Sequence, residues 1–463
     1  MLNAGDTAWV LASAALVMLM TPGLAFFYGG MVRSKSVLNM LMMNFICLAI
    51  VSVLWVLYGF GESFSSDAFG GLIGNFDHAG FAHTWGELAG YATAATDTSP
   101  AVAWPGSDAL PVLAFAMFQL MFAIITPALI SGSIADRAKF WGWGLFVVLW
   151  VTIVYFPVAH WVFSFDGFIG PDALGGWIAN KLKAFDFAGG TAVHINAGAA
   201  GLALAIVLGK RKGWPKDTGR PHNVPFVLLG ASLLWFGWYG FNAGSALSAG
   251  DLAGVAFTNT TVATAAAVLG WLLVEQLKFG KPTTLGAASG AVAGLVAITP
   301  ACGFVTPLGS IAIGVIAGAV CALAVSLKYR FGFDDSLDVV GVHLVGGLAG
   351  TLLIGLFASS SVNSAGGDGL FYGGGWSQLG KQAIAAFAVM GYSFIVTLII
   401  GFIIKAAGGF RVSTEDEVAG IDEAQHAESA YDFGQSVLGG HSGSTPGSVA
   451  ASKDGAALEG SKA

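Results

Sequence analysis

The amino-acid sequence predicts an all-α integral membrane protein with eleven transmembrane helices, and three observations carry this prediction. Charged residues make up 10% of the 463 residues, against about 25% in an ordinary soluble protein. Hydrophobic residues reach 55% and there are 67 glycines, a composition typical of helices that pack closely within a bilayer. Apolar stretches of about 20 residues, the length that crosses a bilayer, recur along the chain. A soluble globular fold is therefore excluded.

These stretches define the predicted spans in order. They are centred on residues 8–31, 37–60, 109–133, 140–163, 187–208, 224–248, 256–277, 285–300, 308–327, 339–358 and 379–406, the eighth being short. The first is predicted to be a genuine helix, because residues 1–7 contain no Lys or Arg and the apolar run continues to Tyr28. A cleaved signal peptide has a positively charged start and a shorter apolar core.

The distribution of Lys and Arg predicts how these helices are oriented. Residues 36–136, which include the long loop 61–108, contain neither residue type. With the N-terminus outside, seventeen of the 20 Lys and Arg residues face the cytoplasm, while Lys181, Lys183 and Lys381 face outside. Such an excess of positive charge is typical of cytoplasmic loops. Because the number of spans is odd, the C-terminus is then also cytoplasmic.

Two histidines inside apolar spans mark the predicted functional centre, since ionisable groups within a bilayer are costly and usually functional. The segments around them share one pattern, Asp–x7–His–x6–Gly, formed by Asp186, His194 and Gly201 and by Asp335, His343 and Gly350. The segments lie on the fifth and tenth spans, so helices 1–5 and 6–10 cross the membrane in opposite directions. This predicts an inverted repeat whose pseudo-two-fold axis brings His194 and His343 together near the bilayer midplane.

A pore accounts for the histidine pair better than a packed core or a metal site does. A lone buried histidine usually bonds a neighbouring helix, but two symmetry-related histidines in glycine-rich helices favour a pore. No metal is predicted, because no third ligand accompanies the pair, and Cys47, Cys302 and Cys321 lack metal or disulfide spacing. No cofactor, enzyme activity or nucleic-acid partner is predicted either, because a nucleophile–base set, a phosphate-binding loop and a basic stripe are all missing.

Five motifs are characteristic of this sequence, and two of them contain the histidines. They are GLAFFYGGMVR (23–33), FDFAGGTAVHINAG (185–198), GWYGFNAGSA (237–246), ITPACGFV (298–305) and DVVGVH (338–343). With these motifs the chain resembles the Amt/Rh/MEP ammonium transporter family, specifically its bacterial Amt branch, from about residue 5 to 431. The resemblance implies a homotrimer in the plasma membrane (the bacterial inner membrane) with one narrow pore per protomer. It also implies a transmembrane domain (1–408) and a cytoplasmic regulatory region (409–432), and the Gly/Ser-rich residues 433–463 are predicted to be a disordered tail.

The resemblance also implies roles for individual residues. His194 and His343 match the pore histidines, and Phe122 and Phe241 match a phenyl gate. Phe118, Phe122, Phe163, Ser245 and Asp186 match the outer ammonium-binding site, whereas Phe27 and Ser289 match the cytoplasmic exit. Two positions depart from the family pattern: Phe163 replaces a usual Trp, and Leu344 replaces a frequent Gly. Phe is a weaker cation–π partner than Trp, and Leu344 is expected to narrow the pore or shift its helix.

The resulting functional prediction is transport of ammonium or ammonia, with methylammonium as an analogue. Ammonium is recruited outside, deprotonated at the gate and conducted as ammonia past the histidines, with net charge transfer. Two alternatives stay open, an electroneutral ammonia channel and an ammonium sensor that signals through its C-terminus. The basic loop 210–220 and the charged segment 411–431 predict a docking surface on the cytoplasmic face. The family resemblance implies that a PII-type signalling protein is the partner.

Overall fold

The computed structural model describes residues 2–90, 109–216 and 219–431, and within them the helices follow the predicted spans. Ten helical stretches of 18 to 31 residues are long and apolar enough to cross a membrane. An additional apolar helix of 15 residues, Thr284–Ile298, lies where the short eighth span is predicted. The prediction of an all-helical membrane protein is therefore confirmed. The predicted tail 433–463 lies outside the described residues.

Several spans are divided into two helices by a π-helical turn or a short break. The α-helices are α1 (Ala4–Met31), α2 (Val37–Leu54), α3 (Phe60–Phe64), α4 (Val112–Ser131), α5 (Phe140–Trp150), α6 (Phe156–Phe163), α7 (Asn196–Leu208), α8 (Val224–Ala243), α9 (Asp251–Phe279), α10 (Thr284–Ile298), α11 (Pro307–Ala324), α12 (Leu327–Phe331), α13 (Val345–Phe357), α14 (Ser377–Ala407), α15 (Thr414–Ala419) and α16 (Ile421–His426). Two short antiparallel strands, β1 (Leu88–Ala89) and β2 (Leu110–Pro111), pair in the long loop before α4.

Local sequence signals explain where several helices begin. The side chains of Asn3, Thr283 and Thr306 accept hydrogen bonds from the backbone amides of Asp6, Gly286 and Gly309, at distances of 2.8 to 3.2 Å. Each bond satisfies one amide of a first helical turn that has no partner within the helix.

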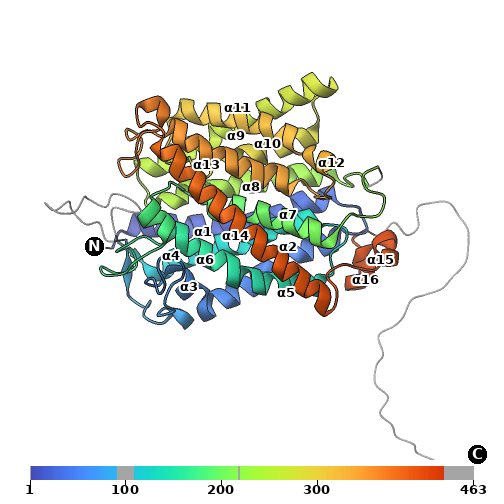
Figure 1. The fold of residues 1–463 in the computed structure, drawn as a ribbon, viewed down its shortest axis with the longest axis horizontal. Helices are drawn as coiled ribbons and strands as arrows, with labels where there is room; N and C mark the ends of the chain where they lie inside the picture. Colours follow the sequence, from blue (N-terminus) through green and yellow to red (C-terminus); the bar gives the residue numbers. More distant parts are fainter. Residues whose placement is uncertain (1, 91–108, 217–218, 432–463) are drawn as a thin grey trace, which may run out of the picture. The chain divides into compact units, whose positions relative to one another are not determined.

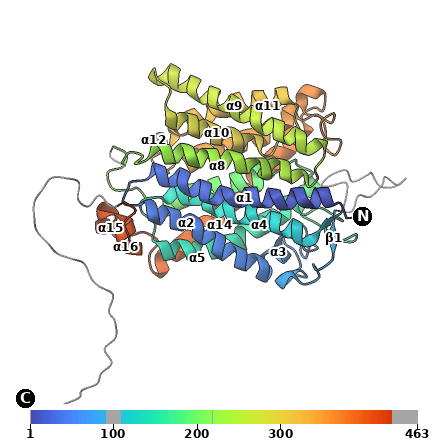
Figure 2. The ribbon, with the colours of Figure 1, turned by 180° about the vertical axis from the view of Figure 1, so that it is seen from behind.

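The two predicted halves pack against each other along extended helix pairs. Helix α1 of the first half lies along α8 of the second (Figure 2). Gly230 permits this contact, because a Cβ atom there would lie 2.2 Å from the backbone nitrogen of Phe27. Helix α14 crosses both halves diagonally and contacts α5, α7 and α13 (Figure 1). The start of α1 and the helices α15 and α16 lie at opposite ends of the bundle (Figure 1), as an odd number of spans requires.

The C-terminal region folds back onto the loops at the predicted cytoplasmic end. The Asp422 carboxylate accepts hydrogen bonds from the amides of Leu38 (3.0 Å) and Asn39 (2.8 Å) in the first turn of α2. Burial raises the pKa of Asp422, and these amides oppose the rise. Glu417 accepts from the amide of Lys212 in the basic loop at 2.6 Å and pairs with Arg411 at 2.6 Å. The charged segment therefore contacts the basic loop within one chain.

Candidate functional site

A pair of π-helical turns positions the two histidines. His194 lies in the turn Gly190–Ile195, which runs into α7, and His343 lies in the turn Val340–Leu344, which runs into α13. π-Helical turns are rare in proteins, and those that occur are often found at functional sites. The Nδ1 atoms of the two imidazoles lie 3.3 Å apart, and both side chains are buried. The predicted pairing of His194 and His343 is thus present in the structure.

The backbone before each histidine repeats the same arrangement. Asp186 accepts from the amide of Thr191 at 2.8 Å, and Asp335 accepts from the amide of Val340 at 2.8 Å, each five residues ahead. The residue three positions after each aspartate has a positive φ, 120° at Gly189 and 63° at Asp338. The sequence repeat therefore corresponds to a repeat in three dimensions.

A column of aromatic rings leads to His194. The rings of Phe122 (α4) and Phe241 (α8) lie 4.4 Å apart between centroids. Phe241 stacks on the His194 ring at 6.0 Å, and Trp238 stacks on it at 5.5 Å. The Nε2 atom of His194 is buried and has no hydrogen-bond partner among the described residues. An unpartnered polar atom in an apolar column is costly, and a small molecule with a donor or acceptor would satisfy it.

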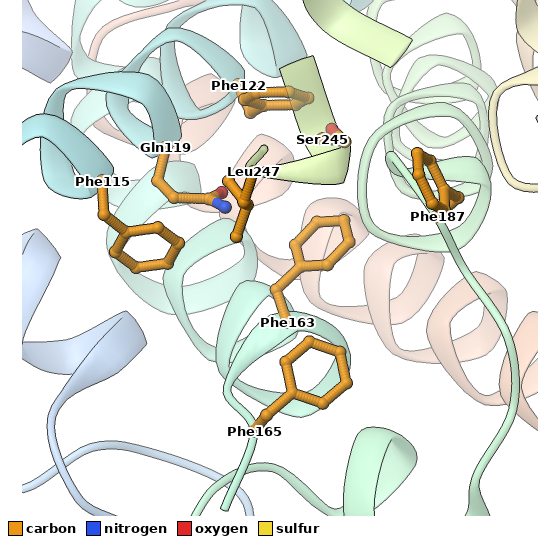
Figure 3. A pocket seen from close by; sticks show the side chains of 8 residues that line it. All are labelled: Phe115, Gln119, Phe122, Phe163, Phe165, Phe187, Ser245 and Leu247. Carbon is orange, nitrogen blue, oxygen red and sulfur yellow. The ribbon is translucent and has the colours of Figure 1, made fainter. Parts of the chain in front are cut away.

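A small cavity lies on the other side of this ring pair. Its volume is ≈ 20 Å³, which is room for about one water-sized molecule. It is lined by Phe115, Gln119, Phe122, Phe163, Phe165, Phe187, Ser245 and Leu247 (Figure 3). The Ser245 hydroxyl donates to the carbonyl of Phe241 at 2.8 Å, so its oxygen lone pairs stay available to the cavity.

Three of the predicted site residues line this cavity, namely Phe122, Phe163 and Ser245. Phe118 does not; its buried ring packs edge to face on Phe122 at 4.9 Å. Trp161, two residues before Phe163, is not in the lining, and its side chain donates to the carbonyl of Leu72 at 2.9 Å. Residues two positions apart on a helix point in directions about 200° apart.

Asp186 is likewise absent from the lining, because its carboxylate is occupied by the start of the π-helical turn. It accepts from the amides of Gly189 and Gly190, both at 2.7 Å, and from the amide and hydroxyl of Thr191. Burial raises the pKa of Asp186, and the Thr191 and glycine donors oppose the rise. The aspartate thus fixes the backbone that carries His194.

The predicted exit residues lie toward the opposite end of the bundle. Phe27 is buried near the end of α1, and Ser289 is half-buried in the second turn of α10. Leu344 is buried and follows His343 directly. It packs on α7 at Gly198, where a Cβ atom would lie 2.4 Å from the backbone nitrogen of Leu344.

Sequence reasoning missed five of the lining residues: Phe115, Gln119, Phe165, Phe187 and Leu247. Gln119 had a usable signal, because it is an amide within an apolar span and polar residues inside spans are usually functional. It also shares a helix face with Phe115 and Phe122, at spacings of four and three residues. No group of three or more potential metal ligands occurs among the described residues.

The structure is an all-helical membrane protein with an inverted repeat, and its buried histidine pair lies beyond an aromatic constriction. These features are typical of membrane transport proteins and their structural relatives. Residues 8–431 match the sequence pattern of the Ammonium Transporter Family. The ammonium transporter of Mycobacterium tuberculosis is 62% identical over 437 residues, covering 93% of this chain and 91% of the relative. The chain therefore belongs to the ammonium transporter family.

Solved structures agree with this assignment. The crystal structure of Saccharomyces cerevisiae Mep2 is similar with a TM-score of 0.76 and 34% identity, covering 89% of this chain and 88% of that one. A structure described as a sensor Amt protein is similar with a TM-score of 0.79 and 29% identity, covering 91% and 98%. The predicted family and its non-enzymatic character are thus confirmed.

Proposed function

We propose that the protein moves ammonium across the plasma membrane by recruiting the cation outside, deprotonating it at the gate and conducting ammonia past the histidines. The observation that carries this proposal is the order of the parts. The small cavity, the Phe122–Phe241 ring pair and the His194–His343 pair follow one another through shared contacts.

Recruitment relies on groups that prefer a small cation with hydrogen-bond donors. The faces of Phe122 and Phe163 attract a cation through the ring quadrupole, and the Ser245 oxygen accepts a hydrogen bond. Ammonium donates such bonds and potassium does not, although the two ions are similar in size. Phe118 packs on the Phe122 ring without lining the small cavity. Asp186 holds the backbone of the turn that carries His194.

Beyond the gate the chemistry favours the neutral molecule. A bare cation among apolar side chains loses its hydration at a cost of many kcal/mol, whereas ammonia carries no charge. The His194–His343 contact uses one nitrogen of each ring, so Nε2 of His194 is free to bond ammonia. The two imidazoles relay the released proton and titrate as a coupled unit. Phe27 and Ser289 lie along the exit.

Two alternatives use the same site. In an electroneutral channel the released proton returns outside, and in a sensor the site binds ammonium while the C-terminal region transmits occupancy. The observations that support the sensor alternative are the similarity to the sensor Amt structure and the contact of α15 and α16 with the inner loops.

The C-terminal region also supports proposals about partners. We expect a PII-type protein to bind the C-terminal region 409–432 and the loop 210–220 where Glu417 contacts Lys212, beside Val418, a residue that is 55% exposed. We expect a homotrimer, with lipid and neighbouring protomers covering the exposed apolar side chains of α9 and α11, such as Leu277 and Leu308. The mass of the intact complex measured with and without a PII protein tests both.

The transport proposal is tested by recording charge movement in proteoliposomes. Ammonium is expected to evoke a saturable current and potassium none, and His194→Asp or His343→Glu is expected to admit potassium. Unchanged selectivity in both variants would contradict the role of the histidines. Absence of current together with an internal pH change would indicate the electroneutral channel, and absence of both would indicate the sensor.

A further inference from the structure

A second cavity adjoins the small one on the predicted outer face. It has a volume of ≈ 600 Å³ and its lining includes Lys183, Lys381, Asp166 and Asp186. Phe165 lines both cavities. Only three Lys or Arg residues are predicted to face outside, and two of them converge here. We call this space the outer basic cavity.

Two lysines and two aspartates line the outer basic cavity, and they differ in how they are engaged. Neither Lys183 nor Lys381 forms an ion pair with another described residue. The Asp186 carboxylate is buried and accepts from four backbone amides and a hydroxyl. Asp166 accepts from the amide of Gly175 at 2.7 Å. Fixed donors therefore engage both oxygens of Asp186 and one oxygen of Asp166. Both ammonium groups lack an ion-pair partner among the residues that the structure describes.

Two further features indicate the chemistry of a ligand. The first two turns of α14 contribute Gln378 and Lys381 to the lining, and no side chain caps the start of this 31-residue helix. Free amides at a helix start carry partial positive charge and favour anions. Phe185 and Phe304 also line the cavity and stack on each other at 4.9 Å. The cavity thus offers cations beside an apolar wall.

We propose that the outer basic cavity binds a phosphate-bearing anion through Lys183 and Lys381. The source is either a free phosphate compound or the headgroup of an anionic lipid, since both present the same charged oxygens. A bound anion neutralises two positive charges beside the small cavity. Because like charges repel an incoming cation, occupancy lowers the ammonium concentration that gives half-maximal transport; this consequence rests on the proposed transport function.

The test measures inorganic phosphate binding to the full-length protein in detergent by titration calorimetry, without ammonium. Lys183→Gln combined with Lys381→Gln is expected to weaken binding about tenfold or more, since two charge-assisted contacts are lost. Lys181→Gln is the matched control, because Lys181 is also predicted to face outside but donates to the carbonyl of Gly70 and is not in the lining. Thermal unfolding of each variant verifies that it is folded.

Unweakened phosphate binding in the double variant, or equal weakening in Lys181→Gln, would overturn the proposal, as would absence of binding to the unmodified protein. Nanodiscs separate the sources: binding lost in phosphatidylglycerol but kept in phosphatidylcholine identifies a lipid headgroup, and binding kept in both identifies a free anion. In proteoliposomes, phosphate is expected to lower the half-maximal ammonium concentration only when both lysines are present. Because phosphate binding is measured without transport, failure of the transport function leaves that result standing.

Discussion

The two halves of the molecule carry the same Asp–His pattern but support it differently. In the first half, Asp186 is occupied by backbone amides and Thr191, and His194 stacks on Trp238 and Phe241. In the second half, Asp335 has one carboxylate oxygen without a hydrogen-bond partner among the described residues, and Lys328 donates to its carbonyl at 2.9 Å. The repeat thus preserves backbone geometry while the side chains diverge, and we infer that the first half holds its histidine more rigidly.

The largest test of this difference removes each imidazole in turn. We expect His194→Ala to reduce methylammonium uptake in proteoliposomes about 100-fold and His343→Ala about tenfold, because a lost hydrogen bond to the moving molecule costs roughly 1–3 kcal/mol. His194 is expected to lose more, since it bridges the aromatic column and His343. Equal losses would show that the histidines act symmetrically, and protein amounts in the vesicles provide the control.

The two aspartates are also expected to differ: replacing Asp186 should lower the free energy of unfolding more than replacing Asp335. Asp186→Asn turns an amide group toward backbone donors and is expected to lower the free energy of unfolding by on the order of 4 kcal/mol, because several charge-assisted bonds are lost. Asp335→Asn keeps an oxygen for Val340, and Lys328 keeps Asp338 at 2.7 Å, so we expect a loss of about 1 kcal/mol. Thermal unfolding in detergent compares the two. A larger loss for Asp335→Asn would reverse the assignment of the more rigid half.

The glycines four residues after each histidine make reciprocal contacts. Gly198 faces the backbone of Leu344, and a Cβ atom at Gly347 would lie 3.1 Å from the Cβ of His194. Gly198→Ala is expected to cost about 2–3 kcal/mol through overpacking. Gly347→Ala is expected to cost clearly less, because the nearest atoms there lie 3.1 Å from the added Cβ rather than 2.4 Å. Leu344→Gly is not expected to rescue Gly198→Ala, since it removes the Leu344 Cβ but leaves the backbone nitrogen and Cα at 2.4 and 2.6 Å. Rescue in a thermal unfolding assay would show instead that the Leu344 side chain shifts the helix.

Sequence reasoning recovered what depends on composition and spacing. Apolar length predicted the spans, and an Asp–His spacing that occurs twice predicted the histidine contact. It did not predict the π-helical turns, because their bonds form only when the packed halves hold the backbone. Nor did it place Phe118 behind Phe122 rather than in the small cavity, since the rotation of α4 depends on its neighbours. The positive φ at Asp338 was not predicted either, because aspartate adopts this conformation only occasionally.

The smallest expected effect comes from a substitution that makes the first half resemble the second. Thr191 corresponds to Val340 in the repeat, and its hydroxyl donates to Asp186. Thr191→Val keeps the shape but removes this bond, so we expect a loss of about 1.5 kcal/mol in the free energy of unfolding. Thr191→Ser retains the hydroxyl and is the matched control. If both variants lose the same stability in thermal unfolding, the methyl packing of Thr191 matters more than its bond. If only Thr191→Val is affected, the hydroxyl accounts for part of the greater rigidity of the first half.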